Sequence, residues 1–301
     1  MTVVRGLALM VALSASAVSC RDASPAKAEQ LKTLETTRKS QLARRIAIAD
    51  ANPRQASPIA IWILPPELRE ISGLTMTADG RMFAHQDEDG TIYQIDPKTG
   101  IVVKRFALDG KPVGDFEAIA AVETDLYLLE SNGKLFVFRE GPEDARVPFT
   151  KYDTRLGKEC EFESLTFEPD SSRLLLACKT ISGKKLKNQL VIYRLPVPIS
   201  DSASLSVLTI PIAEVIGLHG WKGFSPSDMA VDPVTGNYVV IASQQKAIAV
   251  ITPGGRVVRS EPLPGTHQQA EGVAITRDSI LVISDESRHK PAEITLYRWR
   301  P

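Results

Sequence analysis

The stretch QAEGVAITRDSILVISDES, residues 269–287, contains two apolar runs of strand length joined by a short polar turn. One carboxylate, Glu271, stands at the start of the first run, and two more, Asp285 and Glu286, follow the second. Local patterning does not explain acidic residues at these two points. An internal repeat is therefore the first explanation to test.

The same pattern occurs five times in the chain. Its copies are ISGLTM from Ile71, FEAIAA from Phe116, FESLTF from Phe162, PSDMAV from Pro226 and AEGVAI from Ala270. Their second residues are Ser72, Glu117, Glu163, Ser227 and Glu271, which are 45, 46, 64 and 44 residues apart. This spacing is typical of a β-propeller, in which each repeat forms one four-stranded blade.

Strand and turn signals recur within each copy. The first copy has four alternating apolar runs separated by turns at Asp79-Gly80, Asp89-Gly90 and Thr99-Gly100. An Asp-Gly pair between such runs is a hairpin signal. No comparable helical pattern appears after residue 50, so the body of the chain is predicted to be all-β.

The last copy supplies only three apolar runs before the chain stops at Pro301. Residues 57–64, SPIAIWIL, precede the first copy and can pair as the missing fourth strand. We therefore predict a five-bladed β-propeller over residues 57–301, with the N-terminal strand closing the last blade and leaving no long open edge.

The N-terminus is predicted to be an export signal. One positive charge, Arg5, precedes an apolar run that is too short to span a bilayer. The end of this run, AVSC, resembles a bacterial lipobox, which implies that residues 1–19 are removed and that Cys20 is lipidated. An ordinary signal with an incidental cysteine is the alternative. Arg21 in place of aspartate favours the outer membrane, so we expect a periplasm-facing lipoprotein of the cell envelope.

Residues 20–56 are predicted to be a tether, either partly helical or extended. Residues 21–55 carry eight Lys or Arg and four Asp or Glu, whereas residues 56–301 carry 27 and 32. A basic tether can rest on anionic lipid headgroups or be a solvated linker. The chain has no basic stripe with interleaved aromatic residues, so nucleic acid is not an expected partner.

Two cysteines of the exported body are predicted to form a disulfide. Cys160 precedes the run EFESLTF, and Cys178 ends its hairpin neighbour RLLLAC. Antiparallel pairing brings the two side chains close together, and an oxidising compartment allows them to pair. The alternative is two reduced thiols.

Several of the repeat motifs resemble the SdiA-regulated family of bacterial envelope proteins, namely ELREISGLTMTADGRMFAHQDEDGTIYQID, GDFEAIA, CEFESLTFEPD and QAEGVAITRDSILVISDE. The resemblance covers residues 57–299 and implies a five-bladed propeller with a bound calcium ion; the molecular role of that family is not defined. The fourth repeat departs from the motif, since Ser227-Asp228 replaces the glutamate and small residue.

Carboxylates are expected to gather at one end of the propeller channel, where the first strand of each blade starts and the second ends. The candidates are Glu117, Glu163, Glu271, Glu130, Asp285 and Asp115. In a partly dehydrated channel they repel one another unless a cation neutralises them. Calcium suits irregular oxygen ligands better than magnesium, and clustered His or Cys for zinc is absent. The alternative is that these side chains cap strands or pair with Lys and Arg.

A longer third repeat supplies a candidate recognition loop beside the channel mouth. Its side chains are His219, Trp221, Lys222 and Phe224. Loops on a rigid scaffold often carry function, although a longer connection with a buried Trp221 explains the length equally well.

Two classes of function remain open from the sequence. The first is a non-catalytic module that binds a small ligand or an envelope protein. The second is a metal-dependent hydrolase, phytase-like or lactonase-like, that uses a channel metal; fold analogy alone supports it. The chain has no Gly-x-Ser-x-Gly elbow, zinc-protease motif, phosphate loop or dinucleotide fingerprint.

Overall fold

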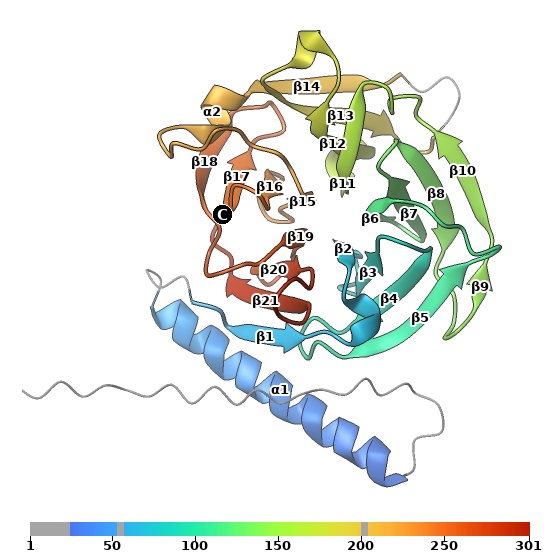
Figure 1. Ribbon diagram of the computed structural model, residues 1–301. Coiled ribbons are helices and arrows are strands. Elements are labelled where there is room, and N and C mark those ends of the chain that lie inside the picture. The colour runs from blue at the N-terminus through green and yellow to red at the C-terminus, as the bar shows by residue number, and fades with distance from the viewer. Residues whose placement is uncertain (1–24, 53–56, 200–203) are drawn as a thin grey trace, which may run out of the picture.

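The computed structural model describes residues 25–52, 57–199 and 204–301. In these residues five sheets are arranged around one axis, and Figure 1 looks down that axis; all strand pairs are antiparallel except β5 with β9. The predicted five-bladed β-propeller is therefore confirmed.

The blades follow the order of the repeats, and each begins with its innermost strand. Blade one contains β2 (Ile71–Met76), β3 (Met82–Gln86), β4 (Thr91–Ile95), β5 (Val102–Leu108) and β9 (Arg146–Val147). Blade two contains β6 (Phe116–Val122), β7 (Asp125–Glu130), β8 (Lys134–Arg139) and β10 (Phe149–Asp153). Blade three contains β11 (Cys160–Glu168), β12 (Arg173–Ile181), β13 (Gln189–Pro196) and β14 (Ser206–Pro211).

Blades four and five contain the C-terminal strands of the chain. Blade four contains β15 (Asp228–Val231), β16 (Tyr238–Ala242), β17 (Ala247–Ile251) and β18 (Val257–Pro262). Blade five contains β19 (Ala270–Ile275), β20 (Ile280–Asp285), β21 (Glu293–Arg298) and β1 (Ala60–Ile63). Short helical segments are η1 (Pro66–Leu68), η2 (Pro169–Ser171), η3 (Lys184–Leu186) and α2 (Ile212–Ile216).

Strand β1 closes the ring as predicted. It pairs antiparallel with β21, from Ala60 opposite Leu296 to Ile63 opposite Glu293. The N-terminal part of the propeller is thereby hydrogen-bonded to its C-terminal strand, and the outer edge of β21 is covered.

The core lies between neighbouring blades rather than along the axis. Among the described residues, each of five buried apolar clusters takes its side chains from two adjacent blades. Every residue of β16 and β17 is buried. This burial explains their continuous apolar runs, because both faces of the sheet are covered by other blades.

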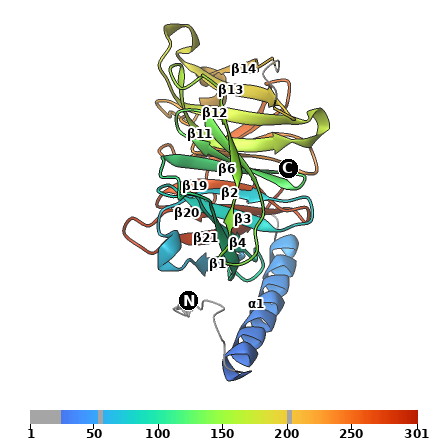
Figure 2. The same ribbon diagram turned by 90° about the vertical axis from the view of Figure 1, so that its right-hand side faces the viewer.

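Helix α1 (Pro25–Ala51) covers most of the segment that we expect to be a tether. Figures 1 and 2 place the helix at the rim beside β1. Leu42 is buried in the cluster between blades five and one, and the Arg38 guanidinium lies 5.1 Å from the centre of the Trp62 ring. In the part of the chain that the structure describes, no helix is both long and apolar enough to span a membrane. The predicted signal and Cys20 lie outside the described residues.

Candidate functional site

A β-bulge at the same position in four blades sets the direction of the repeat residue. The pairing of the first two strands shifts register between Ile71 and Gly73, Phe116 and Ala118, Phe162 and Ser164, and Ala270 and Gly272. The residues left without a partner are Ser72, Glu117, Glu163 and Glu271. A bulge re-aims a side chain out of the regular alternation, and in Figure 1 the strands that carry these bulges are innermost.

The three bulged glutamates come close enough to influence one another. Burial, followed by the charge of Glu163, raises the pKa of Glu117 to about 9 and that of Glu271 to about 8. Burial also raises the pKa of Glu163. Carboxyls from three blades therefore act on one another's ionisation, and they resist carrying three negative charges together.

A lysine that the sequence analysis missed lies among these glutamates. The Lys179 ammonium forms an ion pair with the Glu163 carboxylate, which is 5% exposed. Lys179 follows Cys178 near the end of β12, and the register shifts in this hairpin leave both Lys179 and Glu163 without a strand partner. The available signal was its place directly after Cys178, in the same predicted hairpin as Glu163.

The fourth blade also contributes a carboxylate. Asp228 is 1% exposed, and its Oδ2 accepts a hydrogen bond of 2.7 Å from the backbone N–H of Val273. Burial raises the pKa of Asp228 well above its usual range. Backbone hydrogen bonds oppose this rise, and the charges of Glu271 and Glu163 add to it. We call Glu117, Glu163, Lys179, Asp228 and Glu271 the mouth cluster.

The other predicted ligands divide into two groups. The charge of Asp115 acts on Glu117 and on Glu163, so Asp115 lies near the mouth cluster. Glu130 instead faces cations of its own blade, with Lys151 Nζ at 3.7 Å and Lys134 Nζ at 3.9 Å from its carboxylate.

Asp285 is engaged away from the mouth cluster. It is completely buried, its Oδ2 lies 2.5 Å from Nδ1 of His267, and its Oδ1 accepts a bond of 2.9 Å from the Gln269 N–H. Nε2 of His267 lies 3.0 Å from the Tyr297 hydroxyl. Asp285 therefore holds the segment that leads into β19.

Further carboxylates line the rim beside the mouth cluster and were not among the predicted ligands. Burial, followed by the charge of Glu70, raises the pKa of Asp87. Burial, followed by the charge of Asp87, raises the pKa of Glu286. This end of the propeller is therefore strongly acidic, which favours the approach of cations.

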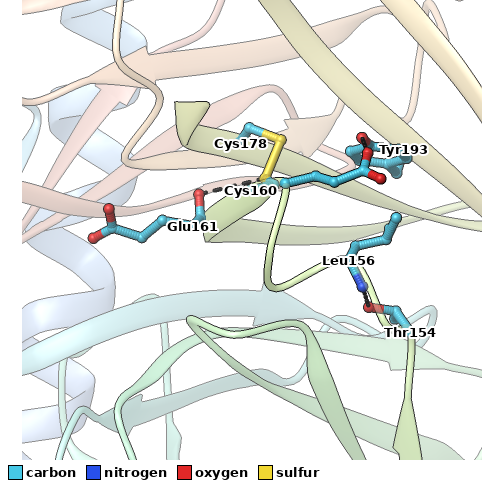
Figure 3. Close-up of a disulfide and its surroundings, with 7 residues drawn as sticks. Thr154, Leu156, Cys160, Glu161, Cys178 and Tyr193 are labelled. Atoms are coloured by element: carbon cyan, nitrogen blue, oxygen red, sulfur yellow. Dashed lines mark hydrogen bonds between the residues drawn. A yellow bond between two sulfur atoms is a disulfide. The ribbon is translucent and has the colours of Figure 1, made fainter. Parts of the chain in front are cut away.

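The predicted disulfide is confirmed, and it links β11 and β12, the two strands that carry Glu163 and Lys179. Cys160 and Cys178 are bonded with a Cα–Cα distance of 5.6 Å, and Figure 3 shows the bridge between the start of β11 and the end of β12. Both cysteines are buried. Glu163 and Lys179 lie within three residues of this bridge, so it restrains both partners of the ion pair.

The predicted recognition loop lies mostly against the outside of blade four. Phe224 is buried in the core, and Trp221 packs against the same apolar cluster. His219 stacks on Trp221 with ring centres 4.4 Å apart, and its Nε2 lies 2.7 Å from the Ser260 carbonyl on β18. Lys222 is exposed. These contacts match the alternative of a longer blade connection.

The end of that connection does reach a pocket beside the mouth cluster. The pocket has a volume of about 260 Å³ and lies among blades three, four and five. It is lined by Glu163, Lys179, Ser225, Pro226, Ser227, Ser243, Gln244, Lys246, Gln268, Gln269, Glu271 and Arg288.

The mouth cluster has the donor chemistry for a hard cation, because its acidic members offer only carboxylate oxygens. In the described residues no three Asp, Glu, His or Cys side chains are placed so that they hold a metal ion. The Lys179 ammonium already supplies one positive charge to Glu163. A metal ion there would have to replace that ammonium.

Comparison with known proteins identifies the fold alone. No protein-family model matches the chain, and no curated protein does. Similar solved structures include glutaminyl cyclase of Myxococcus xanthus, with a TM-score of 0.52, 16% identity and coverage of 80% of this chain and 94% of that chain. A luciferin-regenerating enzyme has a TM-score of 0.51, 10% identity and coverage of 81% and 98%. These identities are too low to transfer an activity, and the chain is similar to these proteins as a β-propeller.

Proposed function

We propose that this protein is a lipid-anchored binding module of the cell envelope whose mouth cluster binds a cation, calcium. The observation that carries the proposal is the convergence of three bulged glutamates whose pKa values are raised by burial and mutual repulsion. The motif resemblance to the SdiA-regulated family supports the choice of calcium, because it implies a bound calcium ion.

The proposal assigns the ion to Glu117, Glu163 and Glu271. Calcium tolerates six to eight oxygen ligands in irregular geometry, which suits carboxylates that come from three different blades. Lys179 has to release Glu163 for the ion to enter, so the lysine and the ion compete for one carboxylate. Neutralising these charges removes the repulsion that burial intensifies.

Calcium is expected to raise the melting temperature of the full chain. At tenfold excess over the dissociation constant the gain is about 1.4 kcal/mol, or about 3–6 °C for a chain of this size. Glu163→Ala and Glu271→Ala should largely abolish the shift, whereas Lys179→Met should enlarge it because the competing ammonium is gone. Differential scanning fluorimetry with calcium or EDTA measures this.

The control for the calcium experiment is Glu123→Ala, which removes an exposed glutamate in the turn after β6. This variant should respond to calcium as the wild type does. An equal shift in all of these proteins would exclude the mouth cluster as the site. Turnover of phosphomonoester or lactone substrates that depends on Glu163 would favour the hydrolase instead.

The anchor is proposed to be a lipid on Cys20 in the outer membrane. Cys20→Ser is expected to move the protein from the membrane fraction to the soluble periplasmic fraction in a Gram-negative host. Palmitate labelling of the wild type, with the variant unlabelled, measures the same chemistry. Equal labelling of both proteins would contradict it.

A further inference from the structure

The lining of the pocket beside the mouth cluster contains side chains of both charges. Its volume of about 260 Å³ is slightly below the range of about 300–1,000 Å³ found for drug-sized ligands, so its ligand is small. Apart from Pro226, every side chain in its lining is polar or charged. Such a lining selects for ligands with charged groups, because an apolar ligand would leave these groups without partners.

Arg288 and Lys246 bring positively charged hydrogen-bond donors to this lining. Arg288 is exposed in the loop between β20 and β21, and within the described residues no hydrogen bond or ion pair engages its guanidinium. Lys246 Nζ donates to the Gln268 carbonyl at 2.8 Å, which leaves two of its three donors for a ligand. A planar guanidinium matches a carboxylate through two parallel hydrogen bonds.

The same pocket also carries acidic side chains. Glu271 and Glu163 line it, and the Lys179 ammonium engages only one of these two carboxyls directly. Glu271 therefore has capacity for a second positive charge. The acidic rim formed with Asp87 and Glu286 adds to the negative potential there.

We propose that this pocket binds a free amino acid as its zwitterion, with the α-carboxylate at Arg288 and Lys246 and the α-ammonium at Glu271. The inference rests on the proposed function as a binding module and specifies its ligand class. A neutral sugar leaves both kinds of charged group unmatched. A phosphate dianion offers no positive group to Glu271, and a plain amine offers no hydrogen-bond acceptor to Arg288.

Isothermal titration of the full chain with a panel of free L-amino acids, in calcium-free buffer, tests the proposal. For the tightest binder, the analogue without the α-amino group and the analogue without the α-carboxylate are each expected to bind at least tenfold more weakly. Arg288→Gln should weaken the amino acid and the carboxylate-only analogue at least tenfold and leave the amine-only analogue unchanged. Arg277→Gln is the matched control, because Arg277 is exposed in the turn at the opposite end of β19.

Calcium is titrated in parallel so that the two proposals fail separately. Arg288→Gln should keep the wild-type calcium response, and Glu271→Gln should lose both ligands. If no amino acid binds while calcium does, the zwitterion pocket is excluded and the cation site stands. Equal binding of the amine-only analogue, or of inorganic phosphate, also overturns the assignment. If neither calcium nor any amino acid binds, both proposals are wrong.

Discussion

Between about pH 5 and pH 8, the free energy of unfolding of the calcium-free protein is expected to fall as the pH rises. The pKa values of Glu117 and Glu271 are raised from 4.5 to about 9 and about 8, first by burial and then by the charge of Glu163. Below about pH 4.5 the folded and unfolded chains both hold these protons, so the two carboxyls do not lower the free energy of unfolding.

The loss of stability occurs between the unfolded and folded pKa values. There the unfolded chain has released protons that the folded chain still holds, so each retained proton lowers the free energy of unfolding by about 1.4 kcal/mol per pH unit. Above about pH 9 both states are ionised and this contribution to the slope ends. The total loss in free energy of unfolding across this pH range is several times the change that a typical surface substitution causes.

Urea denaturation at intervals between pH 5 and pH 9, with EDTA present, measures the slope. Glu117→Gln is expected to make it shallower by about one proton, because the amide keeps the shape of the side chain and does not titrate. Glu123→Gln should leave the slope unchanged. If Glu117→Gln and the wild type show the same slope, Glu117 ionises normally and the mouth cluster is less coupled than we infer.

Replacing Cys160 and Cys178 by alanine is expected to lower the free energy of unfolding by about 3 kcal/mol. The bridge closes a segment with a sequence separation of 18 residues, and the chain-entropy model assigns about this amount to such a loop. The variant should also show a smaller calcium shift, because β11 and β12, which carry Glu163 and Lys179, lose their covalent link.

Equilibrium denaturation with and without reductant tests the bridge. Reductant should destabilise the wild type to the level of the double alanine variant and leave that variant unchanged, so the variant serves as the control for side effects of the reagent. A loss of less than about 1 kcal/mol in both comparisons would show that packing of the hairpin alone holds these strands together.

The architecture was predictable because it depends on local, repeated signals. Apolar runs at blade spacing, Asp-Gly turns and a missing last strand specify five blades and closure by residues 57–64. The disulfide was predictable for the same reason, since Cys160 and Cys178 belong to one hairpin. The repeats also identified Glu117, Glu163 and Glu271 as equivalent positions.

The sequence by itself determined the number of blades, the closing strand, the disulfide and the three equivalent glutamates. Only the tertiary structure decided which charged groups meet. Each bulge is a register shift between paired strands, and such a shift leaves no mark in the residue types of one strand. Lys179 pairs with Glu163 inside blade three, Arg288 lines the pocket from a loop of blade five, and Glu130 and Asp285 have partners of their own. Those encounters depend on three-dimensional proximity, which spacing along the chain does not encode.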